Sequence, residues 1–144
     1  MAKDFFSQEE LEEIKQSIAN AENSSSGEIR LHLENHCKEE VLDRAAYLFE
    51  QLEMHKTELR NGVLFYLAIK DHQFAILGDA GINQKVPEGF WDEIRDHMRS
   101  KFKEGKYKEA LKEGIERSGI KLKEFFPLKD DDQNELNDEI SFGK

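Results

Sequence analysis

The apolar positions along the chain follow two periods, and these periods predict an alternation of helices and strands. Four segments carry apolar residues three and four positions apart, which is typical of a helix that buries one face. These segments are residues 7–21, 41–52, 90–102 and 107–122. The sequence Ser7-Gln-Glu-Glu10 has the spacing of a capping box and marks the start of the first helix.

Three shorter segments predict strands. Residues 28–34 alternate apolar and polar side chains, so the polar face, which includes His32, is expected to meet solvent. Residues 62–69 are apolar throughout, which is typical of a central strand covered by helices on both faces. Residues 73–77 follow after a short polar segment and are expected to form a hairpin with the preceding strand.

The order of these elements predicts the fold class. A strand, a helix and a second strand between residues 28 and 69 predict a right-handed crossover that leaves the two strands parallel. We therefore expect an α/β fold, a three-layer α/β/α sandwich in which about four helices flank a central mixed sheet of three to four strands. One domain is expected over residues 1–127, followed by an acidic tail at residues 128–144 in which Leu136, Ile140 and Phe142 offer a small apolar anchor.

Composition narrows the classes of partner. The 144 residues are 36% charged and carry a formal net charge of -10, and an acidic surface repels nucleic acid at long range. The basic stretch at residues 95–123 is therefore interpreted as a solvated helix face with intrachain pairing. There is no apolar run of signal-peptide or membrane-span length, and the single Cys37 excludes an internal disulfide. We expect a soluble, cytoplasmic monomer that binds neither nucleic acid nor membrane.

Familiar nucleophile motifs fail in this sequence. In a cysteine-dependent phosphatase, the loop that begins at Cys37 would need an arginine at the position occupied by Asp43, and Arg44 lies one residue too far. The chain also has no Gly-x-Ser-x-Gly elbow and no glycine-rich phosphate loop before a lysine. The sequence offers no candidate covalent nucleophile.

Polar side chains converge at one edge of the expected sheet. Parallel strands begin at the same edge, and an antiparallel third strand ends there, which brings together Glu28, Asn61 and Asp79. Carboxylate and amide oxygens are the ligands that Ca²⁺ and Mg²⁺ prefer, so this edge is a candidate site for a divalent cation. The alternative is that Asn61 and Asp79 are ordinary turn residues and that Glu28 pairs with Arg30 or Arg60.

Several stretches together resemble the TPM-domain family, known from thylakoid acid phosphatase and photosystem repair proteins and from bacterial envelope proteins. The matching stretches are residues 25–31, residues 60–68 with Asp71 beyond them, residues 74–82, and Phe90-Trp91. The order and spacing of these stretches extend from the first helix almost to Phe126.

The resemblance implies an α/β/α sandwich, binding of a divalent cation and a metal-dependent phosphatase activity. Carried over to this sequence, it places the metal near Asp79, Asn61 and Glu28, with Asp71 as an alternative acidic position. Relatives often read Gly-aromatic-Gly-Leu-Glu after the third strand, whereas this chain reads Gly78-Asp-Ala-Gly-Ile82, so its acid lies at a different place. The rival hypothesis is a non-catalytic interaction module, in which the acidic tail or the basic fourth helix docks a protein partner and any metal is structural.

Overall fold

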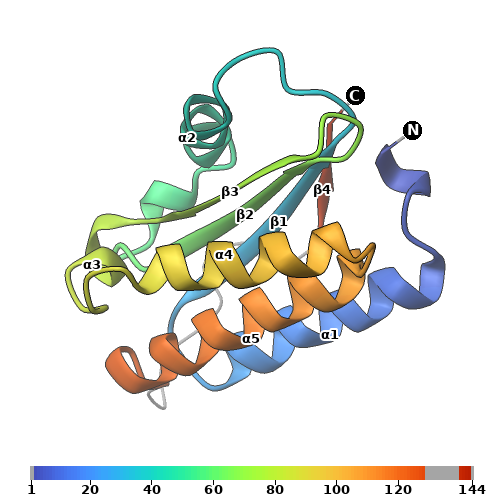
Figure 1. Cartoon of the computed structure of the whole chain (residues 1–144). Helices are drawn as coiled ribbons and strands as arrows, with labels where there is room; N and C mark the ends of the chain where they lie inside the picture. The colour runs from blue at the N-terminus through green and yellow to red at the C-terminus, as the bar shows by residue number, and fades with distance from the viewer. Residues whose placement is uncertain (1, 129–139, 144) are drawn as a thin grey trace.

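A computed structural model describes residues 2–128 and 140–143 of the chain (Figure 1). The long helices are α1 (Gln8–Asn23), α2 (Val41–Gln51), α4 (Phe90–Lys103) and α5 (Tyr107–Phe125). The strands are β1 (Glu28–Glu34), β2 (Gly62–Ala68), β3 (Gln73–Gly78) and β4 (Ser141–Phe142). The short helical segments are η1 (Ala2–Asp4), η2 (Met54–Lys56) and α3 (Ala80–Asn83). The four predicted helices and three predicted strands are all confirmed.

The four strands form one mixed sheet in the order β3-β2-β1-β4. Strands β1 and β2 are parallel, with Glu28 opposite Gly62, as the crossover through α2 predicts. Strand β3 returns antiparallel to β2, so that Gly78 lies opposite Val63. The starts of β1 and β2 and the end of β3 therefore meet at one edge of the sheet, which we call the amino edge. The opposite edge is the carboxyl edge.

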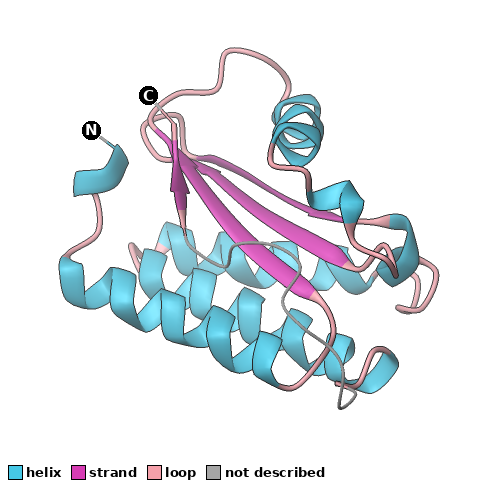
Figure 2. Cartoon of the chain, turned by 180° about the vertical axis from the view of Figure 1, so that it is seen from behind, coloured by secondary structure: helices cyan, strands magenta, loops and turns pink. Residues whose placement is uncertain are grey.

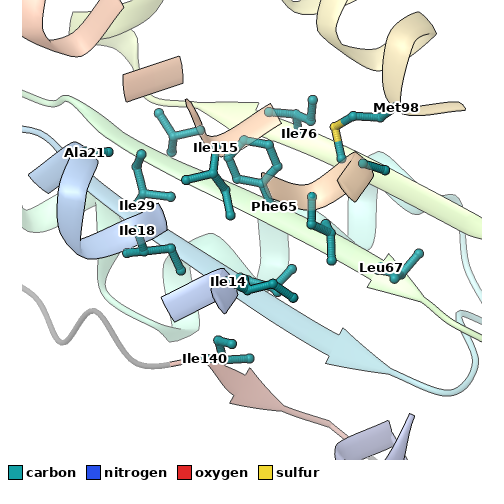
Figure 3. Packing of buried hydrophobic residues seen from close by; sticks show 14 of the residues in the cluster. Ile14, Ile18, Ala21, Ile29, Phe65, Leu67, Ile76, Met98, Ile115 and Ile140 are labelled. Carbon is teal, nitrogen blue, oxygen red and sulfur yellow. The ribbon is translucent and has the colours of Figure 1, made fainter. Parts of the chain in front are cut away.

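Helices cover both faces of this sheet, which confirms the α/β sandwich. Figures 1 and 2 show α2 on one face and α1, α4 and α5 on the other. The larger core lies under the three helices, where side chains from α1 and α5 meet the sheet (Figure 3). Its buried members include Ile14, Ile18, Ile29, Phe65, Ile76, Met98, Ile115 and Leu122.

A second, smaller core lies between the sheet and α2. Leu48 and Phe49 of α2 pack there against Leu64 and Tyr66 of β2, whose alternate side chains face the larger core. All seven residues of β2 are buried, since a strand between two helical layers has no solvent-facing side. This two-sided burial explains the continuous apolar sequence of the segment.

The expectation that His32 faces solvent is wrong. His32 is only 6% exposed, and Glu34 on the same face of β1 is also buried. The alternation in β1 is typical of a half-buried strand, but the polar face lies on the α2 side of the sheet and β4 runs alongside it. Tertiary packing therefore encloses polar side chains that the sequence pattern places in water.

The last described residues add a strand to the sheet. Ser141 and Phe142 pair in parallel with His32 and Leu33 of β1, and the preceding Ile140 is buried in the larger core. Two of the three residues of the predicted apolar anchor thus contact the body of the protein, while Leu136 lies outside the described residues. The boundary between a domain at 1–127 and a tail at 128–144 stays a prediction, because most of that tail is not described.

Local sequence explains where the helices begin and end. The capping box at α1 is confirmed, since the Ser7 hydroxyl accepts from the Glu10 amide and the Glu10 carboxylate accepts from the Ser7 amide. Gly105, with a φ of 76°, separates α4 from α5 in a left-handed conformation that suits glycine. Helix α4 begins at Phe90, three residues after Pro87.

Removing the side chain of Ile140 will test whether the C-terminal strand belongs to the core. The variant Ile140→Ala is expected to lower the free energy of unfolding by about 3 kcal/mol, because it leaves a cavity in the larger core. Phe142→Ala, at a side chain that is 41% exposed, is the matched control and should cost less than about 1 kcal/mol. Urea unfolding followed by circular dichroism measures both, and equal losses would contradict the docking of Ile140.

Candidate functional site

The amino edge brings together the backbone of the segments that the sequence predicted to converge. The carbonyl of Asn61 accepts from the Glu28 amide at 3.4 Å, and the carbonyl of Gly62 accepts from the Asp79 amide at 2.9 Å. Glu28, Asn61 and Asp79 are all buried. The convergence of these three residues is therefore a consequence of the strand register.

The carboxylate of Asp79 is held by Arg60. The guanidinium donates from Nε to Oδ2 and from Nη2 to Oδ1, each at 2.7 Å, and Oδ1 also accepts from the Ala80 amide at 2.8 Å. Hydrogen bonding to Asp79 raises the pKa of Arg60 above its ordinary value. Arg60 lies at the surface, with its side chain 52% exposed, whereas the Asp79 side chain is 6% exposed. Asp79 thus forms a bidentate ion pair with an arginine that is half exposed to solvent.

A close backbone approach shapes this loop. Arg60 has a φ of 53°, and its carbonyl accepts from the amides of Gly81 and Ile82 at 2.7 and 3.3 Å. A Cβ at position 81 would lie 2.0 Å from the carbonyl oxygen of Leu59, so only glycine fits there. The short helix α3 is therefore fastened to the loop that carries Arg60 and Asn61.

Asn61 is a buried amide with an open acceptor. Its side chain is enclosed, since the residue is 1% exposed, and Nδ2 donates to the Ser26 hydroxyl at 3.3 Å. The carbonyl oxygen Oδ1 accepts no hydrogen bond from any residue that the structure describes. A buried polar atom without a partner is costly, and in native structures it often marks the place of a water, an ion or a ligand.

Asp71 lies apart from these residues, at the carboxyl edge. Its Oδ1 is 2.9 Å from Nδ1 of His36, and Oδ2 accepts from the Cys37 amide at 2.7 Å. The bond to His36, followed by that to the Cys37 amide, lowers the pKa of Asp71. Asp71 therefore anchors the β1–α2 loop and does not join the amino-edge residues.

Within residues 2–128 and 140–143, no three histidine, cysteine, aspartate or glutamate side chains form a group that could hold a metal ion.

The carboxyl edge also contains a buried ionic network that the sequence did not predict. Glu34 accepts from the Tyr66 hydroxyl at 2.6 Å and from Nε of Arg44 at 3.1 Å, with a second bond from Nη2 of Arg44. Burial raises the pKa of Glu34, but these hydrogen bonds outweigh it and leave the pKa below its ordinary value. Burial and the bond to Glu34 raise the pKa of Tyr66. The network fastens α2 to the sheet.

His32 extends this network toward the C-terminal strand. Its Nδ1 lies 2.8 Å from the Ser141 hydroxyl, and its ring stacks on Tyr66 with centroids 6.1 Å apart. Burial lowers the pKa of His32, an effect that Glu34 opposes and that Arg44 and Arg30 reinforce. The sequence signal for this cluster was the polar face of β1, but the strand that runs beside it, β4, lies more than a hundred residues later in the sequence, so the pattern alone did not predict its burial.

The basic stretch at residues 95–123 is largely engaged within the chain. Lys108 and Lys112 of α5 both pair with Glu13 of α1, and Arg95 and Arg99 of α4 pair with acids one turn earlier. This supports the interpretation of the stretch as a solvated face with intrachain pairing. Among the helices of the described residues, none has the length and apolarity needed to cross a membrane.

Comparison with known proteins assigns the family. The model of the TPM domain matches residues 2–119, which is most of the chain. The chain therefore belongs to the TPM-domain family, as its resemblance to that family predicts. A search of the curated proteins found no match.

Solved structures agree with this assignment. The BA42 protein from the psychrophilic bacterium Bizionia argentinensis is 45% identical, with a TM-score of 0.90 over 98% of this chain and 97% of that one. The N-terminal domain of a protein from P. gingivalis gives a TM-score of 0.68 at 23% identity, covering 83% of this chain and 77% of the other. The N-terminal domain of cg2496 from Corynebacterium glutamicum gives 0.66 at 12% identity, covering 82% and 74%. These last two similarities concern the fold alone.

The burial of His32 predicts how stability depends on pH. Its folded-state pKa is lowered, so the unfolded chain binds more protons once the pH falls below the ordinary histidine value of about 6.5. The stability that neutral His32 contributes is present above that value and is lost as the pH falls through the folded pKa. We expect His32→Phe, which keeps a ring against Tyr66, to flatten the decline in unfolding free energy below about pH 7. Urea unfolding at a series of pH values measures this, and an unchanged decline would show that His32 does not cause it.

Proposed function

We propose that this TPM domain binds a divalent cation, Ca²⁺ or Mg²⁺, at the amino edge through Asp79 and Asn61, with Glu28 as the neighbouring acid. The observation that carries the proposal is the buried Oδ1 of Asn61, which accepts no hydrogen bond within the described residues. It lies on the loop that also carries Arg60, the partner of Asp79. Carboxylate and amide oxygens are the types of ligand that a hard cation such as Ca²⁺ or Mg²⁺ prefers.

The Arg60 side chain defines what cation binding requires. In the structure its guanidinium occupies both oxygens of Asp79, so a metal ion would have to replace one positive charge with another. The exchange is feasible because Arg60 is largely exposed and can move into solvent, whereas Asp79 stays fixed by its bond to the Ala80 amide. We therefore expect Arg60 and the cation to compete for one carboxylate.

A phosphatase activity is the finer part of the proposal. A bound divalent cation would polarise a phosphoryl group and orient a water molecule. In this chain, Asp79 and Asn61 would hold the cation, and Glu28 is a buried acid whose amide donates to the Asn61 carbonyl at the start of β1. The proposal needs no covalent nucleophile, in keeping with the absence of nucleophile motifs from the sequence.

Replacement of Arg60 and Asp79 will test cation binding. In a titration of the full chain with Ca²⁺ and then Mg²⁺, we expect the amide signals of Asn61, Asp79 and Gly81 to shift and saturate in ¹⁵N nuclear magnetic resonance spectra. Asp79→Asn should abolish these shifts. Arg60→Met should tighten binding by a factor on the order of 5, because it removes the competing cation from a partly exposed pair.

Asp71→Asn is the matched control. It removes the same charge from the carboxyl edge and should leave the shifts at the amino edge unchanged. If the signals of Asn61, Asp79 and Gly81 do not respond to either cation, the site is wrong, and the non-catalytic interaction module becomes the better hypothesis. Loss of the response in Asp71→Asn instead would move the site to the alternative acidic position.

Turnover of a phosphate ester requires a separate measurement. Hydrolysis by the purified chain should depend on the added cation and should disappear in Asp79→Asn. Hydrolysis that survives this substitution would come from another site or from a contaminating enzyme. Cation binding without hydrolysis would retain the metal site and reject the phosphatase activity.

A further inference from the structure

A cleft lies at the carboxyl edge, where the β2–β3 hairpin meets α4 and α5. Its lining comes from Leu67 near the end of β2, Phe74 near the start of β3, the C-terminal end of α4 and the first residue of α5. In open α/β sheets, ligands commonly bind outside the carboxyl ends of the parallel strands. The cleft occupies such a position, at the opposite end of β2 from Asn61, and its argument does not depend on the proposed cation site.

Three aromatic rings line the cleft, those of Phe74, Phe102 and Tyr107. Phe74 and Phe102 meet edge to face with centroids 4.8 Å apart, and the centroids of Phe102 and Tyr107 are 5.2 Å apart. The ring of Phe5 packs edge to face against that of Tyr107, with their centroids 5.1 Å apart. The cleft has a volume of about 280 Å³, and a cavity of about 150 Å³ can hold one benzene molecule. The space and its lining therefore suit a flat aromatic ring.

Two cationic side chains and a histidine line the cleft beside its aromatic rings. They are Arg99, Lys103 and His72, and the lining contains no carboxylate. Arg99 lies over the Phe74 ring at 5.8 Å, where its pair with the exposed Asp96 leaves other N–H groups open to a ligand. Lys103 makes no ion pair with any residue that the structure describes. In a chain with a net charge of -10, a cleft lined by two bases and no carboxylate is a local exception.

We propose that this cleft binds a small planar aromatic anion, a ring that carries a carboxylate or a phosphate group. The ring would lie among Phe74, Phe102 and Tyr107, and the anionic group would meet Arg99 and Lys103 at the rim. An arginine fork recognises both carboxylate and phosphate through paired hydrogen bonds. Neither half of the ligand suffices alone, because the aromatic lining gives affinity for the ring and the two bases select for the charge.

Titration with four small probes will test this proposal on the ¹⁵N-labelled full chain. Benzoate carries both ring and charge, benzyl alcohol carries the ring alone, and acetate carries the charge alone. We expect benzoate to shift the amide signals of His72, Phe74 and Phe102 and to saturate with a dissociation constant on the order of 1 mM. Benzyl alcohol and acetate should bind at least about tenfold more weakly. Phenyl phosphate is the fourth probe, and tighter binding of this compound than of benzoate would identify phosphate as the preferred anion.

Two lysines on α4 provide a matched pair of variants. Lys103→Gln should weaken benzoate binding about tenfold, because it removes a charge-assisted hydrogen bond at the rim. Lys101→Gln removes the same charge from the same helical turn, but residue 101 is on the opposite side of the helix from residues 99 and 103 and does not line the cleft. The Lys101→Gln variant should therefore bind benzoate with the same affinity as the wild-type chain.

Three results would overturn the proposal. One is the absence of saturable shifts at His72, Phe74 and Phe102 with both benzoate and phenyl phosphate. Another is binding of benzyl alcohol as tight as that of benzoate, which would make the cleft an apolar site without selectivity for charge. The third is an equal loss of affinity for benzoate in Lys101→Gln and Lys103→Gln. That result would mean that benzoate binding depends on the net charge of the chain and not on Lys103 in the cleft.

Discussion

The complete burial of β2 is the constraint on which the rest of the structure depends. Seven consecutive residues lie between two helical layers, so the sheet must have α2 on one face and α1, α4 and α5 on the other. The crossover through α2 makes β1 parallel to β2, and the hairpin makes β3 antiparallel. These two relations place Glu28, Asn61 and Asp79 at one edge and Glu34 and Asp71 at the other.

Because helices cover both faces of the sheet, polar groups of β1 and its neighbours are buried. The two edges differ in how these buried groups are hydrogen-bonded. At the carboxyl edge, Glu34 is satisfied by Arg44 and Tyr66, an arrangement that stabilises the contact between α2 and the sheet. At the amino edge, Asn61 keeps a buried oxygen without a hydrogen bond from the described residues, and Asp79 depends on an exposed arginine. The bonds of Glu34 stabilise the fold, and the open acceptor of Asn61 is the observation on which the proposed cation site rests.

Charge is distributed over the molecule in a way that the net value of -10 hides. The basic residues of α5 neutralise Glu13 on α1, and those near the end of α4 surround an aromatic cleft. The two proposed ligands have opposite charge and opposite positions along β2, a cation beside Asp79 and an aromatic anion beside Arg99. Because the two sites share no residue, each can be tested without disturbing the other.

The amino-acid sequence predicts the four long helices, strands β1 to β3, the layers and the convergence at the amino edge, because periodicity, the crossover rule and the hairpin fix the strand directions locally. It could not determine which side chains those neighbours enclose. Whether Asp79 is open to a metal depends on Arg60, and the burial of His32 depends on α2 and on a strand more than a hundred residues later. The aromatic cleft likewise joins residues from the β2–β3 hairpin, α4 and α5. Contacts between distant segments arise only from packing, so the tertiary structure alone decided them.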